Sequence, residues 1–119
     1  MDMRVSPHFA RGEFACRCGC GFAEAAPALI YVLECVRERF GRAVTINSGC
    51  RCETHNRAVG GTDGSCHLRG LAADITVRGV EPALVADYCE SLVLERGGVG
   101  RYAGFTHVDV RGARARWSG

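Results

Sequence analysis

The chain contains no lysine, so arginine supplies every basic side chain other than histidine. The net charge of +2 is too small to indicate nucleic-acid binding. No apolar run approaches the ~20 residues that a transmembrane helix needs. The first residues also lack the apolar stretch of a signal peptide. We therefore expect a monomer that is made in the cytoplasm, with no membrane span and no nucleic-acid partner.

The length and composition are those of one compact domain covering residues 1–119. Hydrophobic residues make up 47% of the 119 residues, which is enough for a core and argues against global disorder. Residues 1–24 are predicted to form an irregular, cysteine-rich segment, because glycines interrupt them. Arg111, Arg114 and Arg116 cluster near the end of the chain. They predict a solvated tail, or alternatively a contact with an anionic wall polymer.

The hydrophobic pattern predicts an α+β fold. Apolar residues at helical spacing predict helices over about 26–40 and 81–96, each with a proline in its first turn. The predicted strands are 43–47, 72–77, 99–102 and 105–110, and residues 56–64 are predicted to form a loop. The last two strands are too close for a helical crossover, so they should form a hairpin. We expect two helices packed on a small, mainly antiparallel sheet.

Two histidines and one aspartate form the main candidate metal site. His67 lies in a loop rich in small residues, Asp74 follows in a predicted strand, and His107 lies in the last strand. Two imidazoles and a carboxylate, with one position left open, are a typical ligand set for a catalytic zinc ion. Each residue taken alone is better explained as an ordinary surface or sheet residue. Taken together, they predict one bound Zn²⁺.

The segments around these residues resemble a known family. Ser65–Asp74 has the pattern Ser-x-His-x-x-Gly-x-Ala-x-Asp, and Phe105–Asp109 carries the late histidine. Together with Ser48–Gly61 and Gly98–Tyr102, these motifs resemble zinc D-Ala-D-Ala peptidases of the M15 type. That group includes cell-wall carboxypeptidases and phage endolysins, and it shares its fold with the Hedgehog signalling domain. The resemblance covers most of the chain and implies a Hedgehog-like fold and a peptidoglycan peptide as substrate.

The resemblance also implies roles for residues near the metal. Arg51 is expected to bind a substrate carboxylate or carbonyl oxygen through its planar guanidinium, either as a substrate-binding or as a catalytic residue. Ser65 is expected to orient the loop or the substrate, and Tyr102 to contact the substrate. The alternative for Arg51 is an ordinary surface arginine.

The general base is less well defined by the sequence. Many relatives have Glu or Asp three residues before the last zinc histidine, where this chain has Gly104. Asp109 is the nearest substitute, because it shares a strand face with His107 at a Cα distance of roughly 6.6–6.8 Å. It is predicted to act as the catalytic base, or alternatively to orient a metal ligand. His55 and Tyr102 are weaker candidates for proton transfer.

The eight cysteines have no single explanation. Cys35 and Cys89 fall in helical patterns and are predicted to be small core residues. The others are compatible with reduced thiols, disulfides or a second metal site. Cys16, Cys18 and Cys20 alternate in a spacing that differs from the usual Cys-x-x-Cys zinc motif.

Three functions are compatible with these features. The principal expectation is an endolysin-like zinc metallopeptidase that cleaves peptidoglycan stem peptides near a D-amino-acid linkage. Without a signal peptide, it is expected to reach the wall after lysis or on a particle. The second is a non-catalytic, Hedgehog-like binding module, which the glycine at position 104 favours. The third is a cysteine-rich structural metal protein.

Overall fold

The computed structural model describes residues 3–62 and 64–119. Its centre is a five-stranded mixed sheet with the strand order β1-β2-β4-β3-β5. Its strands are β1 (Val44–Ser48), β2 (Ala72–Val77), β3 (Gly98–Arg101), β4 (Thr106–Asp109) and β5 (Ala115–Ser118). The β1–β2, β2–β4 and β3–β4 pairs are antiparallel, and β5 joins β3 in parallel. The predicted α+β class, the four predicted strands and the hairpin are therefore confirmed.

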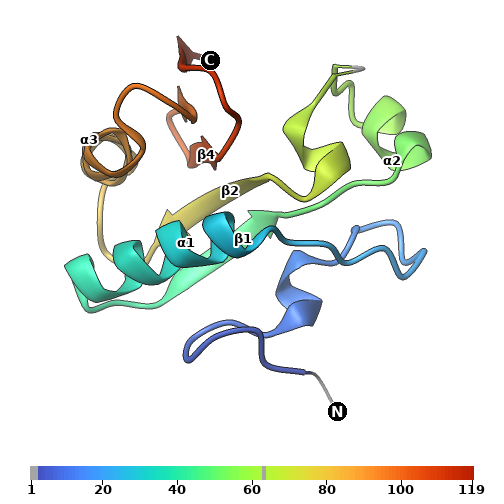
Figure 1. The fold of residues 1–119 in the computed structure, drawn as a ribbon, viewed down its shortest axis with the longest axis horizontal. Helices are drawn as coiled ribbons and strands as arrows, with labels where there is room; N and C mark the ends of the chain where they lie inside the picture. The colour runs from blue at the N-terminus through green and yellow to red at the C-terminus, as the bar shows by residue number, and fades with distance from the viewer. Residues whose placement is uncertain (1–2, 63) are drawn as a thin grey trace.

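Two long helices, α1 (Pro27–Phe40) and α3 (Pro82–Val93), pack against the sheet. Figure 1 shows α1 lying over β1 and β2, with α3 on the side of β4. Both helices begin at the predicted proline and bury an apolar stripe, α1 against β1 and β2, and α3 against β2, β3 and β4. The prediction for α3 extends three residues past the observed end at Val93. The helix ends because Leu94 adopts a left-handed φ of 49°.

Two elements contradict the expectations. Residues expected to lie in a solvated tail form β5, and the Arg116 guanidinium donates hydrogen bonds to the carbonyl oxygens of Gly97 and Leu94. Only Arg114 of the three terminal arginines is exposed. Part of the predicted loop is the short helix α2 (Glu53–Ala58), which begins where the Cys52 thiol accepts a hydrogen bond from the His55 N–H group.

The N-terminal segment is largely irregular, as predicted, but it is packed against the rest of the protein. Its 3-10 helix η1 (Arg11–Phe14) ends at a buried phenylalanine, and Phe9 and Phe14 both belong to the core. Residues 1–2 of the predicted irregular segment lie outside the described residues. Within the described part of the chain, no helix has the length and apolar character needed to cross a membrane.

Candidate active site

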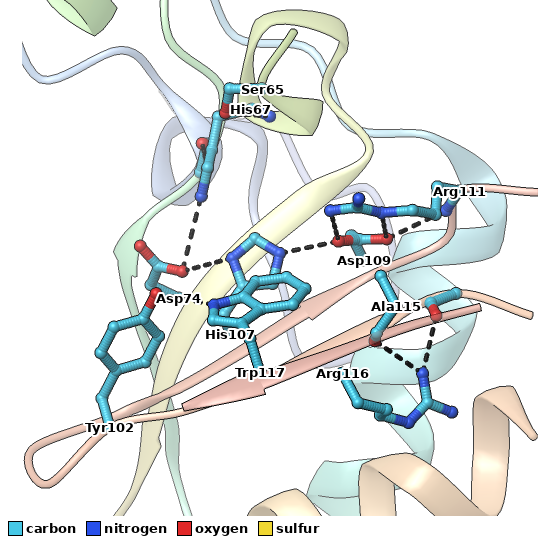
Figure 2. Close-up of polar contacts among 12 residues, drawn as sticks. Ser65, His67, Asp74, Tyr102, His107, Asp109, Arg111, Ala115, Arg116 and Trp117 are labelled. Carbon is cyan, nitrogen blue, oxygen red and sulfur yellow. Dashed lines mark hydrogen bonds and ion pairs between the residues drawn. The ribbon is translucent and has the colours of Figure 1, made fainter. Parts of the chain in front are cut away.

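Three predicted metal ligands meet beside the paired central strands β2 and β4, and we call this group the histidine–aspartate site. Antiparallel pairing of β2 with β4 sets Asp74 directly opposite His107. A second 3-10 helix, η2 (Cys66–Arg69), presents His67 to the same point. One ligand atom of each residue lies within 4.8 Å of the other two. Figure 2 shows Asp74 between the two imidazole rings.

The hydrogen bonds of His67 leave one ring nitrogen available. Its Nδ1 lies 2.5 Å from the carbonyl oxygen of Gly49, which only accepts, so Nδ1 carries the proton. Its Nε2 lies 3.4 Å from Asp74 Oδ1 and is buried without a hydrogen bond among the described residues. A buried nitrogen lone pair without a partner is unfavourable. Because a cation at this point would satisfy it, the residues fit a zinc ion.

The Asp109 carboxylate holds the His107 ring on the side opposite Asp74. Its Nδ1 lies 2.9 Å from Asp74 Oδ1, whereas its Nε2 lies 2.8 Å from Asp109 Oδ2. Asp109 is fully buried and also accepts hydrogen bonds from the Arg111 guanidinium, at 2.7 and 2.9 Å. Asp109 and Asp74 therefore lie on opposite sides of the His107 ring, as Figure 2 shows. Asp109 shares the predicted face with His107, but its contacts are those of a residue that orients a ligand.

The charged groups around His107 shift the pKa values of their neighbours. Burial raises the pKa of Asp74, but the hydrogen bond to His107 and the nearby His67 imidazole outweigh burial and hold that pKa well below its usual range. Burial lowers the pKa of His107, but its contacts with Asp109 and Asp74 outweigh burial and leave the pKa raised. Without a metal, a proton on His107 thus lies next to two carboxylates. A divalent cation would compete with that proton for the same ligands.

An open cleft with a volume of about 410 Å³ leads to these ligands. The predicted substrate-binding residues Arg51, Ser65 and Tyr102 all line it. The Arg51 guanidinium donates a hydrogen bond of 2.9 Å to Asn56 Oδ1, and its Nη2 lies 3.7 Å from Asp74 Oδ2. Arg51 therefore lies beside the ligands rather than on the open surface.

Ser65 has a clear local role in the loop that carries His67. Its Oγ accepts a hydrogen bond of 3.2 Å from the backbone N–H of His67 and so caps η2. This contact fits the predicted role of orienting the loop. It gives Ser65 no base partner of the kind that activates a nucleophile.

One wall of the cleft was not predicted, because it comes from β5. The Trp117 ring packs 4.8 Å from the His107 ring, and its Nε1 donates a hydrogen bond of 2.8 Å to the Tyr102 hydroxyl oxygen. Tyr102 in turn stacks on Phe105. A Cβ atom at Gly100 would lie 2.5 Å from Trp117 Nε1, so this glycine makes room for the indole. The Gly98-Val99-Gly100 pattern was the only sequence signal of this close approach.

The cleft is poor in candidates for the general base. Asp74 supplies the only carboxylate among the described residues that line it. Gly104 is exposed and has no side chain, and neither His55 nor Asp109 belongs to that lining. Of the proton-transfer candidates, only Tyr102 faces the cleft. Its hydroxyl accepts from Trp117, which leaves its proton available for a ligand.

Comparison with known proteins agrees with this geometry. A family model described as Peptidase M15 matches residues 7–109. That span includes the three candidate ligands, Arg51 and Tyr102, and it stops before β5. No curated protein sequence matches the chain significantly. The match covers most of the chain, and the protein belongs to the M15 family of metallopeptidases.

Proposed function

We propose that the protein is a zinc-dependent peptidase that hydrolyses peptidoglycan stem peptides near a D-amino-acid linkage. The observation that carries the proposal is the meeting of His67, Asp74 and His107 at the end of an open cleft. When bound there, zinc supplies Lewis acidity that polarises the scissile carbonyl and lowers the pKa of water toward ~7. The peptidoglycan substrate rests on the family membership and on the D-Ala-D-Ala peptidase motifs.

The side chains around the cleft suit a peptide with a carboxylate nearby. Arg51 presents a planar guanidinium at the cleft wall, which suits bidentate binding of a carboxylate. The Tyr102 hydroxyl can donate its free proton to a developing negative charge on oxygen. The Trp117 and Phe105 rings form an apolar wall next to these polar groups. Asp109 and Arg111 keep His107 in one orientation and one tautomer.

A second function is favoured by one specific observation. A non-catalytic binding module needs no general base, and Gly104 stands where many relatives place a carboxylate. The described cleft lining supplies no carboxylate other than the ligand Asp74. Such a module would bind wall peptides through the same cleft without cutting them.

Mass spectrometry of muropeptides tests the proposal directly. Purified peptidoglycan is digested with the zinc-loaded protein, with and without a chelator. Loss of a terminal D-Ala would identify a carboxypeptidase, and cut cross-links would identify an endopeptidase. Intact muropeptides together with retained binding to the wall would support the binding module and reject the peptidase.

A further inference from the structure

We propose that the protein binds a second, structural zinc ion through the thiols of Cys16, Cys18, Cys20 and Cys52, a group we call the cysteine cluster. Three of these residues come from the N-terminal segment, and the fourth lies just before α2. The four sulfur atoms all lie within 4.8 Å of one another. None of the four is in a disulfide. The proposal shares no ligand with the histidine–aspartate site and does not depend on the proposed peptidase activity.

The separations between the sulfur atoms match a tetrahedral zinc site. The Cys16–Cys18, Cys18–Cys52 and Cys16–Cys52 sulfur pairs are 3.4, 3.6 and 3.8 Å apart. Four sulfurs at ~2.3 Å from a central zinc ion lie about 3.8 Å from each other. A disulfide would instead need a separation of about 2.05 Å. The thiols therefore surround a point at which an ion fits.

The backbone holds the thiols in this arrangement. Gly19 and Gly21 adopt positive φ values of 83° and 91°, so the chain turns sharply around the three N-terminal cysteines. The N–H group of Cys52 donates to the Cys16 sulfur, and the N–H group of His55 donates to the Cys52 sulfur, both at 3.4 Å. These two bonds attach Cys52 to the N-terminal segment on one side and to α2 on the other.

The neighbouring Cys50 thiol lies in an environment that differs from that of the cysteine cluster. Cys50 is buried and donates to the carbonyl oxygens of Phe14 and Phe22, at 3.0 and 3.2 Å. Burial raises its pKa, so it stays a neutral thiol. The cysteine cluster has no comparable set of carbonyl acceptors among the described residues. Four thiols close a tetrahedral site and leave no position for substrate, which is the structural type of zinc site.

A metal in the cysteine cluster would fix one wall of the cleft. The ion would join the N-terminal segment to Cys52, the residue after Arg51. The Arg51 N–H group donates to the carbonyl oxygen of His67, at 2.9 Å. The cluster would thereby hold both the start of α2 and the backbone that carries Arg51. We infer that it positions the cleft without taking part in the chemistry.

Metal content and cobalt spectroscopy test this site in the full-length protein. Reduced wild-type protein, loaded with zinc and desalted, should contain two zinc ions per chain. The Cys18→Ser/Cys20→Ser variant should contain one, and because both side chains are exposed it should still fold. His67→Ala should also contain one. Cys35→Ser, on α1 and outside the cluster, should keep both.

Cobalt(II) identifies which ion is lost. The wild type and His67→Ala should show the intense thiolate-to-cobalt charge-transfer absorption of a tetrahedral sulfur site, and Cys18→Ser/Cys20→Ser should not. Wild-type protein with a single zinc and no such absorption would overturn the proposal. A mass that shows disulfides among these cysteines, or iron in place of zinc, would overturn it as well. Failure of muropeptide hydrolysis with the cobalt result intact would reject only the peptidase.

Discussion

The histidine–aspartate site and the cysteine cluster differ in where their donors come from. Asp74 and His107 stand opposite each other on paired central strands. The cysteines come from a glycine-rich turn and from the residue before a six-residue helix. The first pair is fixed by the backbone of the sheet, whereas the cysteines have little regular structure to hold them. We expect the cysteine cluster to need its metal for order, and the histidine–aspartate site to keep its shape without one.

The two groups also differ in burial and in the surroundings of their donors. His67 and His107 are buried, and each has its second ring nitrogen engaged, by Gly49 and by Asp109. Cys18 and Cys20 are exposed, and only Cys16 of the cluster is buried. The histidine–aspartate site opens into a cleft, while four thiols complete a coordination shell. The histidine–aspartate site therefore leaves room for a substrate, whereas the cysteine cluster leaves none.

The largest expected effect comes from removing a histidine ligand. His67→Ala should abolish metal binding at the histidine–aspartate site and lower kcat/KM by more than ~10²-fold, the usual cost of losing a positioned stabiliser of transition-state charge. The measurement is zinc content together with muropeptide hydrolysis. His55→Ala is the matched control, because the described cleft lining does not include it. Full zinc content and full rate in His67→Ala would reject the site, and a large loss in His55→Ala would assign proton transfer to His55.

The next prediction concerns Asp109, whose two possible roles give different results. If Asp109 orients His107, Asp109→Asn should weaken zinc binding by roughly 10–100-fold, and excess zinc should restore the rate. If it is the general base, the rate at full zinc occupancy should instead fall by ~10²–10⁴. The contacts with His107 and Arg111 favour the first result. The experiment is a zinc titration followed by rate measurement at saturation, with the exposed Asp87→Asn on α3 as control.

Much of the fold could be predicted because its elements have local signals. The helices α1 and α3 and the strands β1 and β2 each carry an apolar pattern of the right period, and β3 and β4 each place one valine in the core. Strand β5 has no such pattern, since Arg116 and Trp117 interrupt it, and it pairs with β3, which is not its neighbour in the chain. Helix α2 is short and begins at a cysteine, which is not a usual capping residue. Strand β5 was missed because a distant strand stabilises it, and α2 was missed because it is short and lacks a usual cap.

In the candidate site, too, residues with a local sequence signal could be predicted, and residues placed by distant contacts could not. His67, Asp74 and His107 could be predicted from the motif, and their meeting is visible in the structure. Strand alternation correctly gave the face of Asp109. It could not give the side of the His107 ring on which Asp109 lies, because that depends on the rotamer and on Arg111. Trp117 could not be found, because its place beside His107 requires β5.

A smaller effect is expected from Arg51, which directly precedes Cys52 of the cysteine cluster and lines the cleft of the histidine–aspartate site. Arg51→Lys keeps the charge but loses the planar fork that reaches Asn56 and the cleft. We expect kcat/KM for muropeptides to fall by about 10–100-fold, because the substrate is less well positioned. Zinc content should stay at the wild-type value for both sites. Arg57→Lys on the exposed face of α2 is the control, and an equal loss in both variants would mean that Arg51 has no specific role.

The smallest expected effect concerns Glu34, which attaches the N-terminal segment to α1, as the cysteine cluster attaches it to Cys52. The Glu34 carboxylate on α1 accepts hydrogen bonds from the Ser6 hydroxyl and the His8 N–H group, at 2.6 and 2.8 Å. Burial raises the Glu34 pKa, but these bonds and the His8 ring outweigh burial and lower it. Its stabilisation is therefore complete above the ordinary value of 4.5 and is lost as the pH falls through the lower folded-state pKa. Glu34→Gln should lower the free energy of unfolding by about 1 kcal/mol at neutral pH.

The difference between wild type and Glu34→Gln should then shrink as the pH falls below about 4.5. Hydrogen exchange separates this anchor from the cysteine cluster. Glu34→Gln should speed exchange of the Val5 and Arg11 amides, which bond to Phe9 and Met3, by about fivefold, the factor that corresponds to ~1 kcal/mol. Cys18→Ser/Cys20→Ser should instead speed exchange at the Cys16 and Gly19 amides of the turn. If Glu34→Gln also released zinc from the cysteine cluster, the two anchors would be one cooperative unit, and the cluster would depend on α1 as well as on its own turn.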